Sequence, residues 1–552
     1  MKHSLVNIIE QSIPRLLTLL DRNPYGDTSG LFDRDFWHFK TSDFSSASFQ
    51  MGVGILAKLY CSDTFYSKNK ILINFIQKAI SSTDKIQHKD GTFDEWYPGE
   101  RGWAGPTGYV LSSFCETFQL IGKDLEPSIR DKLLAIIRKS AISLTRISEA
   151  HTLTNHIAMA WLALVQAKHI LNSNDFDLHI YKLKNSILEN FHQDEGWSLE
   201  YDGADPGYQS GTLCFISKGL RLISDPELET VALKSLKFIS HFAYPDGSVG
   251  GAIGSRHTIT FFISGLFFWR SSPLGRSLCD HLELGLKTSN VVLPLDLDDH
   301  YFVYRLNDFL DSLLILNSIQ ESPVREPLPF EVKNSFFFKK AGMFVFSNEN
   351  IYLVSSLSRG GVIMVWDLNK GEKVVNDSGV LIKHGNLYYS SLWQGKYSIT
   401  EIEGGFEISG YLQKISVRKF NVISQILFRI VTQLFCFHIR SAEFVKNIIR
   451  RLLIVYKNDS RSFFKRSIWI SGNQLTILTS VSCIKKADEI FVGGEFWTRY
   501  VPQSRHFIRN QLNQNFIPQK ISISNLNISQ RSDFEIFNTK DSTLTSCRQF
   551  IE

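Results

Sequence analysis

A proline-rich segment divides the chain into two unlike parts: Glu321-Ser322-Pro323-Val324-Arg325-Glu326-Pro327-Leu328-Pro329. Three prolines in seven residues are typical of a linker, because proline lacks the amide hydrogen that helices and sheets both use. Before this segment, apolar residues recur at helical spacing; after it, short β-branched and aromatic runs alternate with turn residues. We therefore predict a helical domain over 1–320, a linker over 321–335 and an antiparallel β-sandwich over 336–552.

The spacing of apolar residues over 1–320 predicts pairs of antiparallel helices. Residues 72–80 and 133–141 each keep one apolar face, and Ser224-Asp225-Pro226 is a typical helix start. The pattern gives about ten to twelve helices, although no sequence repeat is visible. The fold class predicted from these patterns is an incomplete (α/α) toroid followed by a C-terminal antiparallel β-sandwich.

Composition excludes several classes of protein. The 552 residues are 43% hydrophobic, which argues against a disordered or collagen-like chain. The net charge of +5 is too small to indicate a nucleic-acid partner, but it is compatible with an anionic ligand. Seven scattered cysteines without a CxxC pair favour buried thiols in a reducing compartment. We found no secretory signal or membrane-spanning run, so we expect a cytoplasmic protein.

A basic segment, 414–457, interrupts the β pattern. It holds nine Lys/Arg and one acid, Glu443, interleaved with apolar residues at helical spacing. One interpretation is a helix resting on an anionic membrane surface, at the inner face of the membrane. The other, which we favour on sequence grounds, is an inserted helical hairpin that packs against the rest of the protein.

Several loops of the helical part combine acids, glycines and aromatic residues. If helices alternate in direction, these loops gather on one rim, where their side chains would bind a hydroxyl-rich ligand. The alternative is that Asp-Gly pairs only form turns. The candidate substrate-binding residues from these loops are Trp96, Tyr97, Trp197 and Asp202.

Three loop-to-helix junctions carry the candidate catalytic residues. They are Asn155-His156 after Thr154 as a cap, Gly207-Tyr208, and Arg256-His257. Helix N-termini favour negative charge, so such junctions suit a carboxylated sugar. Each residue also has a purely structural alternative: a helix-terminal amide for Asn155, an interior imidazole for His156, a core phenol for Tyr208, an ion pair with Asp246 for Arg256 and a cap for His257.

With these motifs, the chain resembles the polysaccharide lyases of the heparinase II/III and alginate-lyase kind. The resemblance covers the architecture of most of the chain, and its motif match is confined to the three junctions. It implies β-elimination from a uronic-acid-containing glycan, with bacterial surface-polysaccharide metabolism as one setting for such a reaction. Asn155 and His156, helped by Arg256, would neutralise the sugar carboxylate, and Tyr208 would act as the base. Neighbouring Arg or His would lower the pKa of the Tyr208 phenol toward working pH.

The chain also departs from that family. Family members are usually exported, whereas no export signal is visible here. Many carry a His/Asp metal cluster in the sandwich, but the comparable stretch, 362–386, has one histidine, so we predict no metal and no cofactor. His384 remains a candidate substrate-binding residue facing the cleft from the sandwich, with Tyr388 or Tyr389.

Two other functions stay open from the sequence. One is a toroidal glycoside hydrolase with paired carboxylates, for which the candidates are Asp94, Glu95, Asp202 and Asp205. The other is a non-catalytic glycan-binding or assembly protein, held at a membrane through 414–457. The expected partner is an acidic polysaccharide or oligosaccharide in either case, and not a nucleic acid.

Overall fold

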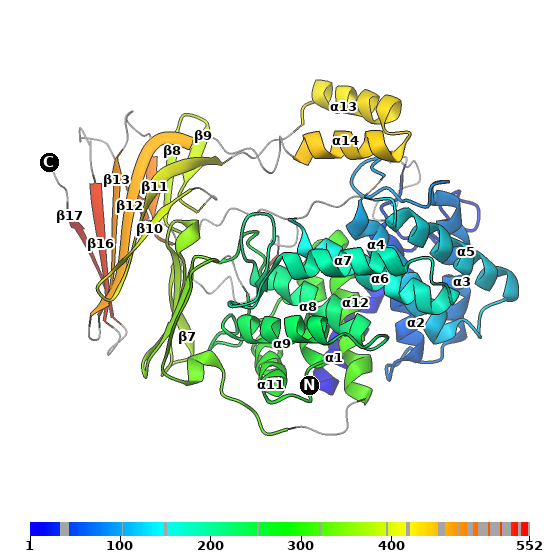
Figure 1. Ribbon diagram of the computed structural model, residues 1–552, viewed down its shortest axis with the longest axis horizontal. Coiled ribbons are helices and arrows are strands. Elements are labelled where there is room, and N and C mark those ends of the chain that lie inside the picture. The colour runs from blue at the N-terminus through cyan, green and yellow to red at the C-terminus, as the bar shows by residue number, and fades with distance from the viewer. Residues whose placement is uncertain are drawn as a thin grey trace.

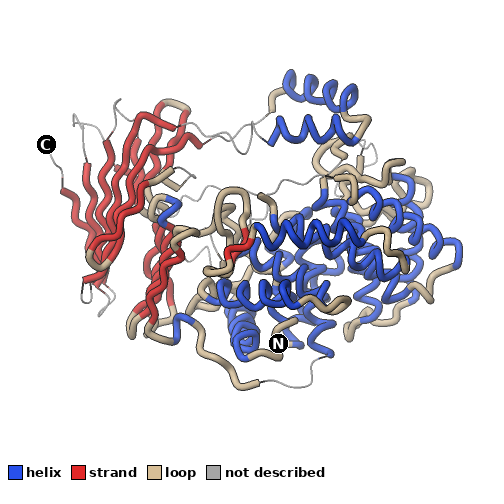
Figure 2. The backbone as a smooth tube through the Cα atoms, in the orientation of Figure 1, coloured by secondary structure: helices blue, strands red, loops and turns tan. Residues whose placement is uncertain are grey.

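The computed structural model describes most of the chain. The described residues are 1–33, 44–101, 103–147, 152–250, 253–318, 323–392, 396–415, 420–450, 459–471, 474–482, 489–494, 506–507, 519–521, 531–538 and 543–549. Figure 2 shows that helices make up one body of the molecule and strands the other, with a separate pair of helices above the helical body.

The helices up to residue 318 form two concentric layers. The inner layer consists of α2 (Gly52–Cys61), α4 (Ala104–Ile121), α6 (Thr154–Leu171), α8 (Pro206–Leu220), α10 (Ile263–Phe267) and α12 (Asp299–Ser318). Each inner helix packs against the next one, and α12 returns to pack against α2, which closes the ring. The outer layer consists of α1 (Lys2–Leu19), α3 (Lys70–Ile86), α5 (Pro127–Leu144), α7 (Asp177–Glu189), α9 (Pro226–Ser240) and α11 (Pro273–Thr288). This arrangement confirms the predicted toroid, although we expected an incomplete one and the inner helices close the ring. One inner helix, α10, is only five residues long.

The two layers follow from the distribution of apolar residues. Helix α6 is apolar on all sides and is buried along nearly its whole length, whereas α7 buries only Ile187. A helix that is apolar all round has to be enclosed by others, while an amphipathic helix covers them. The predicted start of α9 is confirmed, since the Asp225 side chain accepts hydrogen bonds from the amides of Glu227 and Leu228.

Two antiparallel sheets follow the helices. The five-stranded sheet has the order β3 (Asn334–Phe338), β4 (Met343–Ser347), β5 (Ile351–Ser356), β6 (Val362–Asp367) and β7 (Glu372–Asp377). The ten-stranded sheet has the order β15 (Gln519–Ile521), β14 (Glu489–Val492), β8 (Val380–His384), β9 (Leu387–Ser390), β11 (Gly405–Ile415), β12 (Asp459–Ser471), β13 (Gln474–Ser482), β16 (Arg531–Asn538) and β17 (Thr543–Gln549), with β10 (Ser398–Ile402) on β11. A two-stranded hairpin, β1 (Phe191–His192) and β2 (Trp197–Ser198), lies within the helical body.

The five-stranded sheet joins the ring to the larger sheet (Figure 1). Alternating residues of β5 and β6 point to opposite faces. Leu353 and Val365 belong to the core between the two sheets, which makes them a sandwich. On the other face, the Tyr352 hydroxyl donates a hydrogen bond to the His241 carbonyl at 2.6 Å, and Trp366 stacks on Tyr244 of the ring with centroids 4.1 Å apart. The predicted fold class, a toroid followed by an antiparallel β-sandwich, is therefore confirmed.

The basic segment between β11 and β12 forms a helical hairpin, α13 (Val422–Phe435) and α14 (Ile439–Arg450). Figure 1 shows it above the ring, on the side of α4 and α5 and away from the sheets. Arg101 Nη1 donates a hydrogen bond to the Phe437 carbonyl at 3.0 Å, and the Tyr97 and Phe428 rings lie 5.0 Å apart. The hairpin thus packs against the helical body, although most of its apolar side chains are exposed. Residues 416–419 and 451–457 of the predicted insertion lie outside the described residues.

Two expectations about the chain as a whole concern its thiols and its membrane contact. The described thiols of Cys61, Cys115, Cys214, Cys279 and Cys436 form no disulfide, and all but Cys61 are buried. Cys483 and the Cys547 side chain lie outside the description. None of the helices in the described ranges is both long enough and apolar enough to span a bilayer.

Candidate active site at the mouth of the toroid

A cavity of about 530 Å³ lies where the ring meets the α13–α14 hairpin. Its walls come from the 95–106 loop, the starts of α6, α8 and α12, the 256–262 loop and the hairpin. Six of the predicted site residues line it: Trp96, Tyr97, Asn155, His156, Tyr208 and Arg256. Predicted residues that are far apart in the chain therefore meet around one space, since Trp96 and Arg256, which are 160 residues apart, share it.

Asn155 lies in the first turn of α6, beside a buried carboxyl. Its backbone amide lies 3.5 Å from Glu200 Oε2, and the neighbouring Thr154 hydroxyl donates to the Leu199 carbonyl at 2.6 Å. Thr154 is thus the first helical residue, and its predicted capping role is wrong. The buried Asn155 Nδ2 and Glu200 Oε1 atoms have no hydrogen-bond partner within the described part of the chain. Of these two residues Asn155 lines the cavity, so its Nδ2 group is a buried donor beside the space that a ligand would occupy.

Glu200 is a buried carboxyl that the sequence interpretation missed. Burial raises its pKa to about 8, although the nearby side-chain and backbone amides of Asn155 and the positive charge of Arg256 act in the opposite direction. At neutral pH the group is therefore mostly protonated and adds little negative charge to the site. No sequence pattern marks it, because its neighbours in space come from two other segments.

His156 is held by an indole. Trp103 Nε1 donates a hydrogen bond to His156 Nδ1 at 3.1 Å, with the two rings 5.6 Å apart. Because Nδ1 accepts this bond, the proton of the neutral imidazole sits on Nε2. The side chain is thereby set up as a hydrogen-bond donor through Nε2. Trp103 was missed as well, although it ends the same aromatic loop that holds Trp96.

A single carboxylate, Asp205, joins the second and third junctions. Its Oδ1 accepts a hydrogen bond from the Tyr208 amide at 3.1 Å, and its Oδ2 accepts one from the Arg256 amide at 2.8 Å. A side chain on Gly254 would bring a Cβ within 2.4 Å of Asp205 Oδ2, so only glycine allows this approach. The guanidinium carbon of Arg256 lies 3.9 Å from the centre of the Tyr201 ring. Asp205 therefore holds together the two backbone segments that carry the Tyr208 phenol and the Arg256 guanidinium.

The acidity of Tyr208 differs from what the sequence led us to expect. Burial raises the pKa of its phenol well above the ordinary value, and the opposing effect of Arg256 is smaller. The expected lowering of this pKa is therefore wrong for the ligand-free site. Desolvation by the surrounding phenols and aromatic rings outweighs one guanidinium.

Four predicted site residues lie elsewhere. His257 is buried next to Arg256, with a φ of +56°, but does not line the cavity. Trp197 donates from Nε1 to Glu195 at 2.7 Å and stacks on His192, where it is buried. Asp202 is exposed on its loop outside the cavity. His384 lies in β8 with its ring 5.9 Å from that of Tyr389, outside the cavity wall, because the larger sheet is separated from the ring by the smaller one.

A histidine that the sequence interpretation missed lies in another part of the cavity wall, at the start of α12. His300 Nε2 lies 3.1 Å from Glu95 Oε1, and its Nδ1 lies 3.3 Å from the Ser48 hydroxyl. Burial raises the pKa of Glu95 to about 7. Both ring nitrogens of His300 thus face protein groups, while its ring packs on Trp96 with centroids 4.5 Å apart. The Asp298-Asp299-His300-Tyr301 stretch carries no recognisable motif.

The hairpin supplies the roof of the cavity. Phe420, Phe428 and Ile449 add apolar surface, and Lys446 and Arg450 add positive charge to that of Arg256 and Arg305. The carboxylates in the wall are Glu95 and Glu100, and burial raises the pKa of both. The walls of the cavity are therefore aromatic and positively charged. Within the described ranges, His, Cys, Asp and Glu side chains form no group of three or more with metal-binding geometry.

Comparisons with known proteins give low similarities. No family model and no curated protein matches the sequence. Among solved structures, heparinase III is similar with 9% identity and a TM-score of 0.41, over 94% of this chain and 85% of that one. Cellobiose 2-epimerase from Bacillus thermoamylovorans matches with 10% identity and a TM-score of 0.43, over 57% of this chain and 100% of the other. A mutant unsaturated glucuronyl hydrolase from Streptococcus agalactiae matches with 11% identity and a TM-score of 0.42, over 58% and 93% respectively. At these similarities the comparisons concern the path of the backbone and not the chemistry of the cavity.

Proposed function

We propose that the protein is a polysaccharide lyase that cleaves a uronic-acid-containing glycan by β-elimination. The observation that carries the proposal is that Asn155, His156, Tyr208 and Arg256 all line one aromatic, positively charged cavity. In such an elimination, the proton on C5 of the uronate leaves, the C4–C5 double bond forms, and the bond from C4 to the glycosidic oxygen breaks. The leaving oxygen then takes up a proton.

The first requirement is neutralisation of the sugar carboxylate. The C5 proton is too weakly acidic unless donors stabilise the charge that develops on that carboxylate in the transition state. The Nδ2 group of Asn155 is a buried donor without a partner among the described residues, and the imidazole of His156 is fixed as a donor through Nε2. The guanidinium of Arg256 supplies the positive charge. We assign these three groups to the carboxylate.

The second requirement is a group that accepts the C5 proton. Tyr208 is the candidate, because it lines the same cavity and its backbone amide shares the Asp205 carboxyl with the backbone amide of Arg256. Its raised pKa means that the reactive phenolate is scarce at neutral pH. We therefore expect kcat/KM to rise about tenfold per pH unit below the phenol pKa. The protonated phenol then returns its proton to the leaving oxygen.

The hydrolase alternative is supported less well. Of its candidate carboxylates only Glu95 lines the cavity, and both of its oxygens are bound by Ser48 and His300. Asp94 pairs with His88 at 3.0 Å, and Asp205 caps α8. A glycosidase needs a second carboxylate across the scissile bond. A non-catalytic glycan-binding protein would use the same aromatic walls. Only a measurement of catalytic activity distinguishes it from a lyase.

A substrate panel tests the proposal. Purified protein is incubated with uronate-containing polymers, and new ultraviolet absorbance from the conjugated double bond is followed. We expect turnover of at least one polymer, and a loss of about 10²-fold or more for Tyr208→Phe. Tyr181→Phe is the matched control, because Tyr181 is 61% exposed on the outer helix α7. Full turnover by Tyr208→Phe would remove Tyr208 as the base.

A further inference from the structure

The outer side of the α13–α14 hairpin is apolar and uncovered. Ile423, Ile426, Leu427, Ile430, Leu434 and Phe437 are each between 47% and 71% exposed. Their spacing along α13 puts most of them on one face of the helix. The opposite face carries Phe428, which lines the cavity, and buried Thr432 and Cys436, which pack near Gly99. The hairpin is thus held to the ring on one side while its apolar side faces outward.

A basic recess adjoins this apolar face at the turn of the hairpin. A cavity of about 1070 Å³ is lined by Lys89, Arg101, Arg146, His438 and Arg440, together with Phe437 and Asp90, which is the one acid among its described lining residues. Arg101 is engaged with Asp90 and with the Phe437 carbonyl. Lys89, Arg146 and Arg440 are exposed, and they form no ion pair with any residue that the structure describes. Apolar surface and exposed cationic side chains therefore lie side by side at Phe437.

We propose that the hairpin and its basic recess form a docking surface for an anionic lipid bilayer. An apolar helix face enters the boundary between head groups and acyl chains, and neighbouring cations bind the phosphates of anionic lipids. A second copy of the chain fits this surface less well, since a symmetric contact would bring two basic recesses together. Because the same hairpin roofs the main cavity, docking brings the mouth of that cavity beside the lipid surface. The docking proposal does not rest on the proposed lyase activity.

Vesicle sedimentation of the full chain tests the docking surface. We expect the protein to sediment with vesicles that contain phosphatidylglycerol, but not with pure phosphatidylcholine vesicles, and to be released by high salt. Ile426→Glu/Leu434→Glu should weaken binding by at least about tenfold, because two charges replace apolar groups in the docking face. Arg146→Glu/Arg440→Glu should also weaken it, while excess inorganic phosphate at constant ionic strength should leave it intact.

Matched controls separate docking from general effects of charge. Leu233→Glu changes an apolar residue that is 44% exposed on α9, and Lys70→Glu/Lys132→Glu reverses two exposed charges on α3 and α5. Both should bind vesicles like the wild type. Phe437→Ser, at a 71% exposed side chain, is a second variant if the double glutamate variant melts early.

Three results would overturn the proposal. The first is absence of binding to phosphatidylglycerol vesicles, or binding that the hairpin variants leave unchanged. The second is a wild-type dimer in light scattering that Ile426→Glu/Leu434→Glu converts to a monomer, with no vesicle binding, which would assign the face to a second copy. The third is release by inorganic phosphate, which would make the recess a small-anion site.

Discussion

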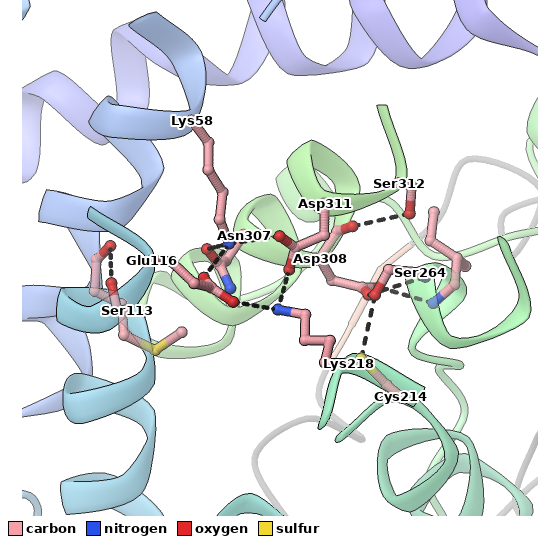
Figure 3. Close-up of polar contacts among 12 residues, drawn as sticks. Lys58, Ser113, Glu116, Cys214, Lys218, Ser264, Asn307, Asp308, Asp311 and Ser312 are labelled. Atoms are coloured by element: carbon pink, nitrogen blue, oxygen red, sulfur yellow. Dashed lines mark hydrogen bonds and ion pairs between the residues drawn. The ribbon is translucent and has the colours of Figure 1, made fainter. Parts of the chain in front are cut away.

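The helical ring contains two buried polar clusters. In one cluster the charged side chains pair with one another, and in the other two polar atoms lack a hydrogen-bond partner among the residues that the structure describes. In the centre, Lys58 and Lys218 each pair with both Glu116 and Asp311 at 2.6–2.8 Å (Figure 3). At the mouth, Asn155 Nδ2 and Glu200 Oε1 have no hydrogen-bond partner within the described part of the chain. Both clusters draw their residues from distant segments, so position in the chain does not separate them.

The central ion cluster serves the fold. Its four side chains come from α2, α4, α8 and α12, and none of them is more than 12% exposed. Burial would raise the pKa of Glu116, but the two ammonium groups outweigh it and lower that pKa to about 2. Two positive and two negative charges therefore compensate one another where four inner helices meet. The comparison teaches that the charges in the centre of the ring compensate one another, whereas the cavity wall holds a buried donor, Asn155 Nδ2, that a ligand can use.

The largest expected effect comes from breaking the central cluster. Lys218→Met leaves two buried carboxylates with one ammonium group, so we expect a loss of about 3–5 kcal/mol in the free energy of unfolding, measured by chemical denaturation. Lys234→Met, at an exposed position on α9, should change stability by less than about 0.5 kcal/mol. A loss below about 1 kcal/mol for Lys218→Met would mean that the cluster does not hold the inner helices together.

Removing an open group at the mouth should affect activity and not stability. Asn155→Ala should lower kcat by about 10²–10³-fold, because a donor to the developing carboxylate charge is lost. The melting temperature should stay close to that of the wild type, since Nδ2 has no hydrogen-bond partner among the described residues. Asn190→Ala, at the end of α7, is the control for an asparagine at a helix terminus. An unchanged kcat, or a large loss of stability, would place Asn155 with the structural residues.

The buried carboxyls of the cavity wall should give stability a dependence on pH. The pKa of Glu95 is about 7 in the folded protein and near 4.5 in the unfolded chain, so the folded state binds its proton more tightly. This contribution is fully present below pH 4.5 and is lost as pH rises through 7, by up to about 3 kcal/mol. Glu95→Gln should flatten the decline in unfolding free energy over this range, whereas exposed Glu189→Gln should not. An identical slope in Glu95→Gln would contradict the assigned pKa.

The smallest effect is expected from the aromatic wall. Trp96 is 42% exposed and faces the cavity, so Trp96→Ala should raise KM by about tenfold or less through lost contact with the sugar. Phe65→Ala, at a side chain that is 86% exposed in the loop between α2 and α3 and outside the cavity wall, should leave KM unchanged. If Trp96→Ala lowered kcat and left KM unchanged, the indole of Trp96 would position the sugar for reaction and would not contribute to its binding.

The features that could be predicted from the sequence are each marked by a short, recognisable stretch of residues. The prolines of 323–329 separate the helices from the strands, and the junctions at Asn155, Tyr208 and Arg256 follow recognisable turn residues. Because helices of a toroid alternate in direction, the marked starts of α6 and α8 were enough to bring Asn155 and Tyr208 together. The third junction was wrong, since Arg256 and His257 lie in a loop and the next helix, α10, begins only at Ile263.

The parts that the sequence missed depend on spatial neighbours. Glu200 and His300 become notable only through burial and through partners from other helices. Trp197 has the composition of a sugar-binding residue, but its indole is used within the β1–β2 hairpin. Lys58 did leave a local signal, since it is a buried lysine in the otherwise apolar run of α2. A single charge in such a helix predicts a buried ion pair.

The most direct test counts the ends that the reaction creates. With a polymer that the protein cleaves, unsaturated ends are measured by ultraviolet absorbance and new reducing ends by a colorimetric assay on the same sample. Elimination at the cavity predicts one unsaturated end for each new reducing end. Reducing ends without any unsaturated product would contradict the lyase assignment and favour hydrolysis.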